Sequence, residues 1–129
     1  MDIKPLVLIV EDDTTSLART ASLFEGSADI IVATDGRDAI NALADELLPS
    51  IIILDADLPD MSGFDICTRI KQDPRTEHIP VIFLSGYDDF MFEQQAFAAG
   101  CVDYFTKPVV SSRFLLRVNA HLPKGKKIK

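Results

Sequence analysis

The sequence predicts one α/β domain in which a parallel five-stranded sheet is covered by helices on both faces. Three observations predict this class. Short runs of large apolar residues alternate along the chain with segments whose apolar residues recur at helical spacing. Most of these runs are uninterrupted and rich in β-branched residues, as in strands that are buried on both faces. Four of the runs end in a carboxylate, a hydroxyl or an ammonium group, which places polar side chains at one edge of the sheet.

Five apolar runs are the predicted strands. Each has four or five residues, rich in Val, Ile, Leu or aromatic side chains, and is bounded by polar or turn-forming residues. In chain order they are residues 6–10, 30–34, 51–54, 80–84 and 102–106. The run IIIL at 51–54 is apolar throughout and is expected at the centre of the sheet.

Five further segments are the predicted helices. In chain order they span about residues 14–24, 36–47, 64–71, 89–99 and 109–122. The first should be capped within residues 14–16, because Thr and Ser accept backbone hydrogen bonds at a helix N-terminus. The stop signals for the other end of four helices are Gly26, Pro49, Gly100 and Pro123.

The flavodoxin-like strand order 2-1-3-4-5 is the most economical arrangement of five strands joined by right-handed crossovers. It makes the first and third strands neighbours where the winding direction changes. Glu11, Asp12 and Asp55 then meet in one crevice at the carboxyl edge of the sheet. Ser85 and Lys107 should flank this crevice from the fourth and fifth strands.

The side chains at this edge suit phosphoryl transfer. Three crowded carboxylates repel one another unless a cation joins them, and Mg²⁺ prefers such oxygen ligands. Asp55 could then attack a phosphoryl group and form an acyl phosphate. Lys107 would bind one phosphoryl oxygen, and the Ser85 hydroxyl would donate to another. Each residue alone is a common surface residue, but the set at one edge indicates function.

As a set, these residues resemble the receiver domain of two-component response regulators, the CheY-like superfamily. The resemblance covers residues 6–122 and rests on four motifs, which are VEDD at 10–13, LD at 54–55 followed by Pro59 and Gly63, LSG at 84–86 and YFTKP at 104–108. It implies that Asp55 accepts a phosphoryl group from a histidine kinase or histidine phosphotransfer protein in a Mg²⁺-dependent reaction. It also implies a cis peptide bond between Lys107 and Pro108.

The resemblance also assigns roles within the site. The Mg²⁺ ligands would be Glu11, Asp12, Asp55 and the backbone carbonyl of Asp57. Ser85 and Tyr104 would form a switch pair, and Lys107 would contact the phosphoryl group. Asp57 and Tyr87 occupy positions where side chains tune the lifetime of the phosphoryl group.

An output surface is expected on the face formed by the fourth helix, the fifth strand and the fifth helix. Phe90, Met91 and Phe92 open that helix and cannot all face the core. We expect Met91 or Phe92 to face outward, and Ala96 and Phe97 to face inward. Phosphorylation would then make this face a surface for an output domain, a partner protein or a homodimer.

A phosphohydrolase is the alternative interpretation. Residues 52–57 (IILDAD) also resemble the first motif of haloacid-dehalogenase-type phosphatases, with Asp55 as nucleophile and Asp57 as acid and base. The receiver is favoured because the motif falls on the third strand and no cap segment is left over. On the receiver interpretation, the protein is not an enzyme but a signalling phosphoacceptor, with at most self-phosphorylation and self-dephosphorylation.

Composition limits the expected partners and location. The formal net charge of −7, from 13 basic and 20 acidic residues, argues against direct nucleic acid binding. No apolar run approaches the about 20 residues of a membrane span. Cys67 and Cys101 lack metal-site spacing, so we expect reduced thiols in a cytoplasmic protein without membrane contact. His78 and His121 lack neighbouring ligands in the sequence and are assigned to the surface.

The C-terminal part bears on domain organisation. We expect a domain over residues 1–122, followed by a basic tail or linker stub over 123–129. Residues 115–122 resemble the last helix of receivers that precede domains for cyclic-dinucleotide synthesis or breakdown. The chain could then be the receiver of a larger cyclic-dinucleotide signalling protein.

Overall fold

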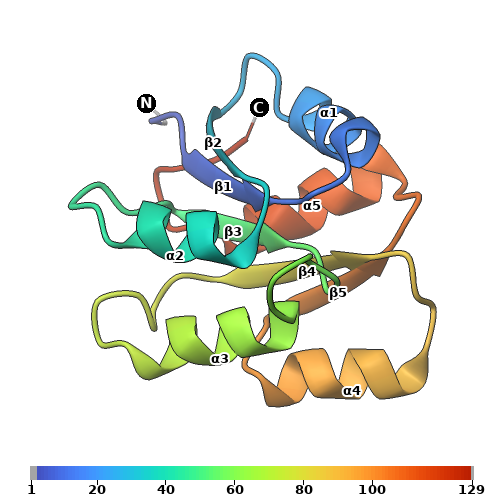
Figure 1. Cartoon of the computed structure of the whole chain (residues 1–129). Coiled ribbons are helices and arrows are strands. Elements are labelled where there is room, and N and C mark those ends of the chain that lie inside the picture. The colour runs from blue at the N-terminus through green and yellow to red at the C-terminus, as the bar shows by residue number, and fades with distance from the viewer. Residues whose placement is uncertain (1–2, 129) are drawn as a thin grey trace.

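A five-stranded sheet forms the middle layer of the structure, a computed structural model that describes residues 3–128 (Figure 1). Its strands are β1 (Leu6–Val10), β2 (Asp29–Ala33), β3 (Ile51–Leu54), β4 (Val81–Ser85) and β5 (Asp103–Thr106). Their order is β2-β1-β3-β4-β5, and every neighbouring pair is parallel. The predicted fold class and strand order are therefore confirmed.

Five helices cover the two faces of the sheet. They are α1 (Thr14–Leu23), α2 (Gly36–Leu43), α3 (Gly63–Gln72), α4 (Phe90–Ala98) and α5 (Ser111–His121). Figure 1 shows α1 and α5 on one side of the sheet, and α2, α3 and α4 on the other. Each side has its own apolar core, which the sheet separates.

The strand β3 contributes to both cores. Ile51 and Ile53 pack with α1 and α5, whereas Ile52 and Leu54 pack with α2, α3 and α4. This alternation follows from the two-residue period of a strand. All four side chains are at most 1% exposed, and burying each contributes about 1.5 to 3 kcal/mol. The strand that carries Asp55 at its end is thus firmly fixed.

Two predicted helix ends differ from the structure. The cap of α1 is Asp13, whose carboxylate accepts a hydrogen bond from the Ser16 N–H at 2.8 Å, rather than a residue within 14–16. The helix α2 ends at Leu43 and leaves Leu47 67% exposed. Arg75 explains this early end, because its guanidinium donates to the carbonyls of Leu43 and Asp45 at 3.0 and 2.8 Å.

Residues 123–128 lie against α5. The side-chain amide of Asn119 donates to the Ile128 carbonyl at 2.9 Å, and its oxygen accepts from the Ile128 N–H at 2.6 Å. Lys127 Nζ donates to the carbonyls of Asn119 and Leu122. Ile128 is 6% exposed and joins the core beside α5. Most of the expected basic tail is therefore packed against the domain, while Lys129 lies outside the described residues.

Within residues 3–128, none of the helices combines the length and the apolar character that a bilayer span requires.

Candidate functional site

The carboxyl ends of four strands bring the predicted site residues together. Glu11 follows β1, Asp55 follows β3, Ser85 ends β4 and Lys107 follows β5. Glu11, Asp12 and Asp55 each offer a carboxylate oxygen within 4.8 Å of the others. Glu11 is buried, Asp55 is partly buried and Asp12 is exposed. The expected crevice at the point where strands β1 and β3 meet is therefore present.

Backbone hydrogen bonds that extend the sheet hold three of these residues. The Asp55 N–H donates to the Val10 carbonyl at 3.0 Å. The Glu11 N–H donates to the Ala33 carbonyl at 2.9 Å, and the Lys107 N–H to the Ser85 carbonyl at 2.7 Å. The side chains thus start from a rigid sheet edge rather than from free loops.

The loop after β3 folds back closely on the site. A Cβ atom at Gly63 would lie only 2.3 Å from the Asp55 carbonyl oxygen, so this position accommodates no side chain. The Asp60 carboxylate accepts from the Gly36 and Arg37 N–H groups at 2.8 and 2.9 Å. These hydrogen bonds lower the pKa of Asp60 and tie the loop to the start of α2.

The carboxylates at this edge carry uncompensated charge. Burial, followed by hydrogen bonding with Glu11 and repulsion from it, raises the pKa of Asp55 to about 7. Lys107 lowers this pKa only in part, because its ammonium forms a salt bridge with Glu11. A cation held by carboxylate oxygens would relieve the repulsion. The donor set of Glu11, Asp12 and Asp55 therefore fits a hard divalent ion.

Tyr87 connects the two residues of the predicted switch pair. Ser85 is fully buried, and its hydroxyl oxygen accepts from the Tyr87 N–H at 3.1 Å. The Tyr104 hydroxyl donates to the Tyr87 carbonyl at 2.7 Å, and burial raises the pKa of Tyr104. The Ser85 hydrogen stays available for another acceptor, since a hydroxyl donates and accepts independently.

The two residues expected to tune phosphoryl lifetime lie side by side. The Asp57 carboxylate beside the Tyr87 hydroxyl raises the pKa of Tyr87. The Asp57 N–H lies 3.5 Å from Asp55 Oδ1. The influence of Tyr87 and Asp57 on lifetime, and the use of the Asp57 carbonyl as a metal ligand, remain predictions.

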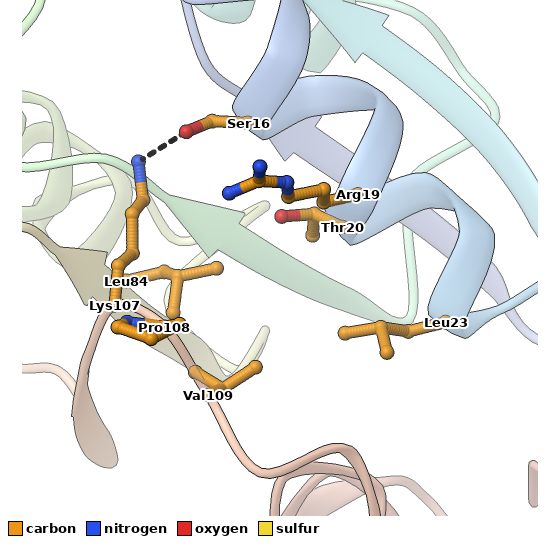
Figure 2. A pocket seen from close by; sticks show the side chains of 8 residues that line it. All are labelled: Ser16, Arg19, Thr20, Leu23, Leu84, Lys107, Pro108 and Val109. Carbon is orange, nitrogen blue, oxygen red and sulfur yellow. Dashed lines mark hydrogen bonds between the residues drawn. The ribbon is translucent and has the colours of Figure 1, made fainter.

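An open hollow of about 310 Å³ lies next to the carboxylates, between α1 and the connection from β5 to α5 (Figure 2). Arg19 and Thr20 extend from α1 toward it, and Val109 borders it on the other side. Lys107 Nζ lies 3.4 Å from Ser16 Oγ across the top of this hollow. Lys107 therefore borders both the carboxylate cluster and a concave surface. Its peptide bond to Pro108 is cis.

The first turns of α4 differ from the expectation. Met91 is 62% exposed and Ala96 is buried, as expected. Of the two alternatives for the outward residue, Met91 is exposed and Phe92 packs against the core. The predicted inward position of Phe97 was wrong, because Phe97 is 46% exposed. Phe90 and Phe97 are seven residues apart and share the outer side of the helix, whereas Phe92 and Ala96 share the inner side.

His121 was wrongly assigned to the surface. Its Nε2 lies 3.1 Å from Oδ2 of Asp103, a buried carboxylate that also pairs with Arg117 at 2.9 Å. Asp103 begins β5 and lies 18 positions before His121, so only the packing of α5 on the sheet brings them together. His78 is exposed, as expected.

Comparison with known proteins identifies the family. Residues 7–119 match the sequence model of the response regulator receiver domain. Protein PilG of Pseudomonas aeruginosa is 34% identical over 120 residues, which cover 92% of this chain and 88% of PilG. The beryllofluoride-activated receiver domain of DrrB from Thermotoga maritima has a TM-score of 0.81 at 31% identity, over 92% of this chain and 97% of that one.

Other relatives are much longer than this chain. A protein of Vibrio cholerae named as a probable cyclic di-GMP phosphodiesterase is 38% identical over 116 residues, which cover 90% of this chain and 26% of that protein. Across several curated relatives that it matches, the chain spans only 9% to 52% of their length. The similarity to these relatives is therefore confined to one domain of each.

The phosphohydrolase alternative is not supported by these findings. The receiver match covers residues 7–119, and the sheet has the strand order β2-β1-β3-β4-β5 of the flavodoxin-like receiver fold. Fold, site geometry and similarity agree on one assignment. The chain therefore belongs to the response regulator receiver domain family, the signalling phosphoacceptors of two-component systems.

Proposed function

We propose that Asp55 accepts a phosphoryl group from a histidine kinase or a histidine phosphotransfer protein. One observation carries this proposal, namely that carboxylate oxygens of Glu11, Asp12 and Asp55 lie within 4.8 Å of one another beside Lys107. Asp55 is the member of this set at the end of the central strand, which gives a nucleophile a fixed position. No residue has to leave the sheet edge for the reaction to occur.

In the proposed reaction, an Asp55 carboxylate oxygen forms a bond to phosphorus while the bond from phosphorus to the donor imidazole nitrogen breaks. Lys107 would exchange its contact with Glu11 for one with a phosphoryl oxygen, which its flexible stem allows. The Ser85 hydroxyl would donate its free hydrogen to another oxygen.

Mg²⁺ is the proposed cofactor, with Glu11, Asp12, Asp55 and the backbone carbonyl of Asp57 as the residues that would hold it. When bound, Mg²⁺ supplies positive charge for the transferring phosphoryl group. Asp55 cannot act as a nucleophile while it carries a proton, and the neighbouring carboxylates favour its protonated form. A cation held by these residues would therefore keep Asp55 ionised near neutral pH.

The proposed output passes through Ser85 and Tyr104 to the face of α4, β5 and α5. Ser85 and Tyr104 both bond to the backbone of Tyr87, so a movement of Ser85 toward a phosphoryl group would shift this loop. The exposed Phe90 and Met91 lie at the start of α4, directly after the loop. This face would then bind an output domain, a partner protein or a second copy of the chain.

For the whole protein we propose a cytoplasmic signalling role without catalytic turnover beyond self-phosphorylation and self-dephosphorylation. Cys67 and Cys101 are free, buried thiols, which suits a reducing compartment. The 38% identity to a probable cyclic di-GMP phosphodiesterase supports a place in cyclic-dinucleotide signalling.

A small acyl-phosphate donor with Mg²⁺ tests the phosphorylation of Asp55. Intact-mass spectrometry should detect one phosphoryl addition on the wild type and on Glu77→Gln, a carboxylate control at the opposite edge of the sheet. The addition should be absent from Asp55→Asn, since an amide cannot form the acyl phosphate. A single phosphoryl addition that persists in Asp55→Asn would refute the assignment.

A further inference from the structure

Five aromatic side chains form a closed chain between the phosphoryl site and α4. They are Phe64 of α3, Phe83 of β4, Tyr87 of the loop after β4, Phe92 of α4 and Tyr104 of β5. Ring centroids are separated by 4.6 Å for Tyr87 and Phe92, 5.6 Å for Phe92 and Phe64, 5.3 Å for Phe64 and Phe83, and 6.4 Å for Phe83 and Tyr104. The hydrogen bond from Tyr104 to the Tyr87 carbonyl closes the chain.

Tyr87 is the member of this chain that lies at the phosphoryl site. Its N–H bonds to the Ser85 hydroxyl oxygen, and its own hydroxyl lies beside the Asp57 carboxylate. Tyr87 is 48% exposed, so the rest of the protein covers only about half of its surface. Among the aromatic pairs of the described residues, Phe92 alone stacks on Tyr87, with an interplanar angle of 14°.

Phe92 is itself well anchored. It packs against the core below α4 and lies 5.6 Å from Phe64, which stacks on the fully buried Phe83. A half-exposed ring stacked on an anchored ring loses much of its freedom, and such a stack stabilises by more than the area it buries. Phe92 therefore restrains the position of the Tyr87 side chain.

We propose that Phe92 is a positioning residue that lengthens the lifetime of the acyl phosphate by holding the Tyr87 side chain at the edge of the site. The inference rests on the proposed phosphorylation of Asp55. Held there, the Tyr87 ring narrows the approach of water to Asp55. The state of α4 is thereby coupled to the time for which the signal persists.

The step that Phe92 would slow is hydrolysis. A water oxygen forms a bond to phosphorus while the bond from phosphorus to the Asp55 carboxylate oxygen breaks. The leaving carboxylate keeps the electron pair, one proton of the water stays on the released phosphate and the other goes to solvent.

The stack itself can be tested without phosphorylation. The sequence has no Trp and two Tyr, and both tyrosines belong to this aromatic chain. Near-ultraviolet circular dichroism in the tyrosine band therefore reports on it directly. Phe92→Leu keeps apolar volume and removes the ring, so the tyrosine signal should fall, whereas Phe97→Leu on the outer side of α4 should leave it unchanged.

The lifetime test uses protein phosphorylated by a small acyl-phosphate donor with Mg²⁺, freed of donor and followed by intact-mass spectrometry. Phe92→Leu should shorten the lifetime about twofold to tenfold, which corresponds to the energy of one aromatic stack. Phe92→Tyr should restore it, and Phe97→Leu should match the wild type. Tyr87→Leu should shorten the lifetime as well, with no further effect of Phe92→Leu in the double variant, because Phe92 acts through Tyr87.

Two failures can be distinguished. If the wild type takes up no phosphoryl group on Asp55, the proposed function fails and this inference falls with it. If the wild type is phosphorylated and Phe92→Leu loses the tyrosine signal without any change in lifetime, only the role of Phe92 is refuted. Additive effects of Phe92→Leu and Tyr87→Leu would also refute it, because they would show two independent contributions.

Discussion

Asp55 destabilises the folded protein at neutral and alkaline pH. Burial, with Glu11 as neighbour, raises its pKa to about 7 in the folded state, whereas an unfolded chain gives an aspartate pKa of about 3.9. The folded state therefore binds a proton more tightly than the unfolded state. The stability this provides is complete below pH about 4 and is lost as the pH rises through about 7.

Replacing Asp55 should therefore stabilise the protein in a pH-dependent way. Asp55→Asn removes the buried charge, so its free energy of unfolding at pH 8 should exceed that of the wild type by about 1 to 2 kcal/mol, after allowance for solvent screening. The gain should vanish near pH 4, where the wild-type carboxyl is protonated. Urea unfolding of both proteins at the two pH values measures the difference, and equal stability at pH 8 would contradict the raised pKa.

Mg²⁺ should stabilise the wild type through the same carboxylates. At ten times its dissociation constant, a ligand of the folded state adds about 1.4 kcal/mol, which a thermal melt at pH 8 detects. Asp12→Ala removes one of the predicted ligands and should abolish the rise in melting temperature, while Glu77→Ala at the opposite edge should keep it. The rise should also shrink at pH 5.5, because Asp55 is then protonated. Retention of the full rise in Asp12→Ala would place the metal elsewhere.

The sequence was informative about site residues that follow a strand directly. Glu11, Asp55, Ser85 and Lys107 could be placed because an apolar run determines where the next side chain emerges. Asp60 could not, because its bonds to Gly36 and Arg37 span more than 20 positions between two loops. Such contacts depend on tertiary packing, which local pattern does not encode.

The ends and orientations of helices depend on partners from other elements. Periodicity alone extends α2 to Leu47, but the guanidinium of Arg75 takes the carbonyls of Leu43 and Asp45 and ends the helix earlier. Periodicity was equally uninformative for α4, in which apolar residues lie all around the helix. Its inward side is the one on which Phe92 packs against the core and stacks on Tyr87.

The C-terminal segment offers a test at the level of one element. Asn119→Ala removes both side-chain hydrogen bonds to Ile128 and leaves the backbone N–H and carbonyl of Ile128 without these partners. The free energy of unfolding should fall by about 1 to 3 kcal/mol. Asn41→Ala on the exposed side of α2 is the matched control and should change it little. If both variants are equally stable in urea, residues 123–128 contribute nothing to the fold.

At the level of the whole molecule, parallel topology explains why so much of the site could be predicted. Each carboxyl strand end lies at the same edge, so residues up to 96 positions apart, such as Glu11 and Lys107, meet without any specific loop design. The same topology does not determine which residues act at the opposite edge of the sheet or on the outer faces of the helices. The structure adds which side chains on these outer faces are exposed.

The outer face of α4 suggests how activation could change the assembly of the molecule. Phe90 and Met91 are 69% and 62% exposed and begin the helix that follows the Tyr87 loop. Large neighbouring apolar side chains on a surface favour association when they become part of a contiguous patch. A shift of the loop on activation would reorient this helix start. We therefore expect self-association to depend on these two side chains rather than on the inward-facing Phe92.

Sedimentation velocity with and without beryllofluoride and Mg²⁺ measures this association. The wild type should shift toward a dimer on activation, and Phe90→Ser combined with Met91→Ser should remain monomeric. Leu47→Ser is the control, because it removes a similarly exposed apolar side chain that lies after α2 and away from the α4 face. It should behave as the wild type. An unchanged mass of the activated wild type would leave the α4 face to a separate partner. An equal shift in the wild type and the double variant would locate the dimer interface on another face, since loss of two exposed apolar side chains from an interface centre weakens binding measurably.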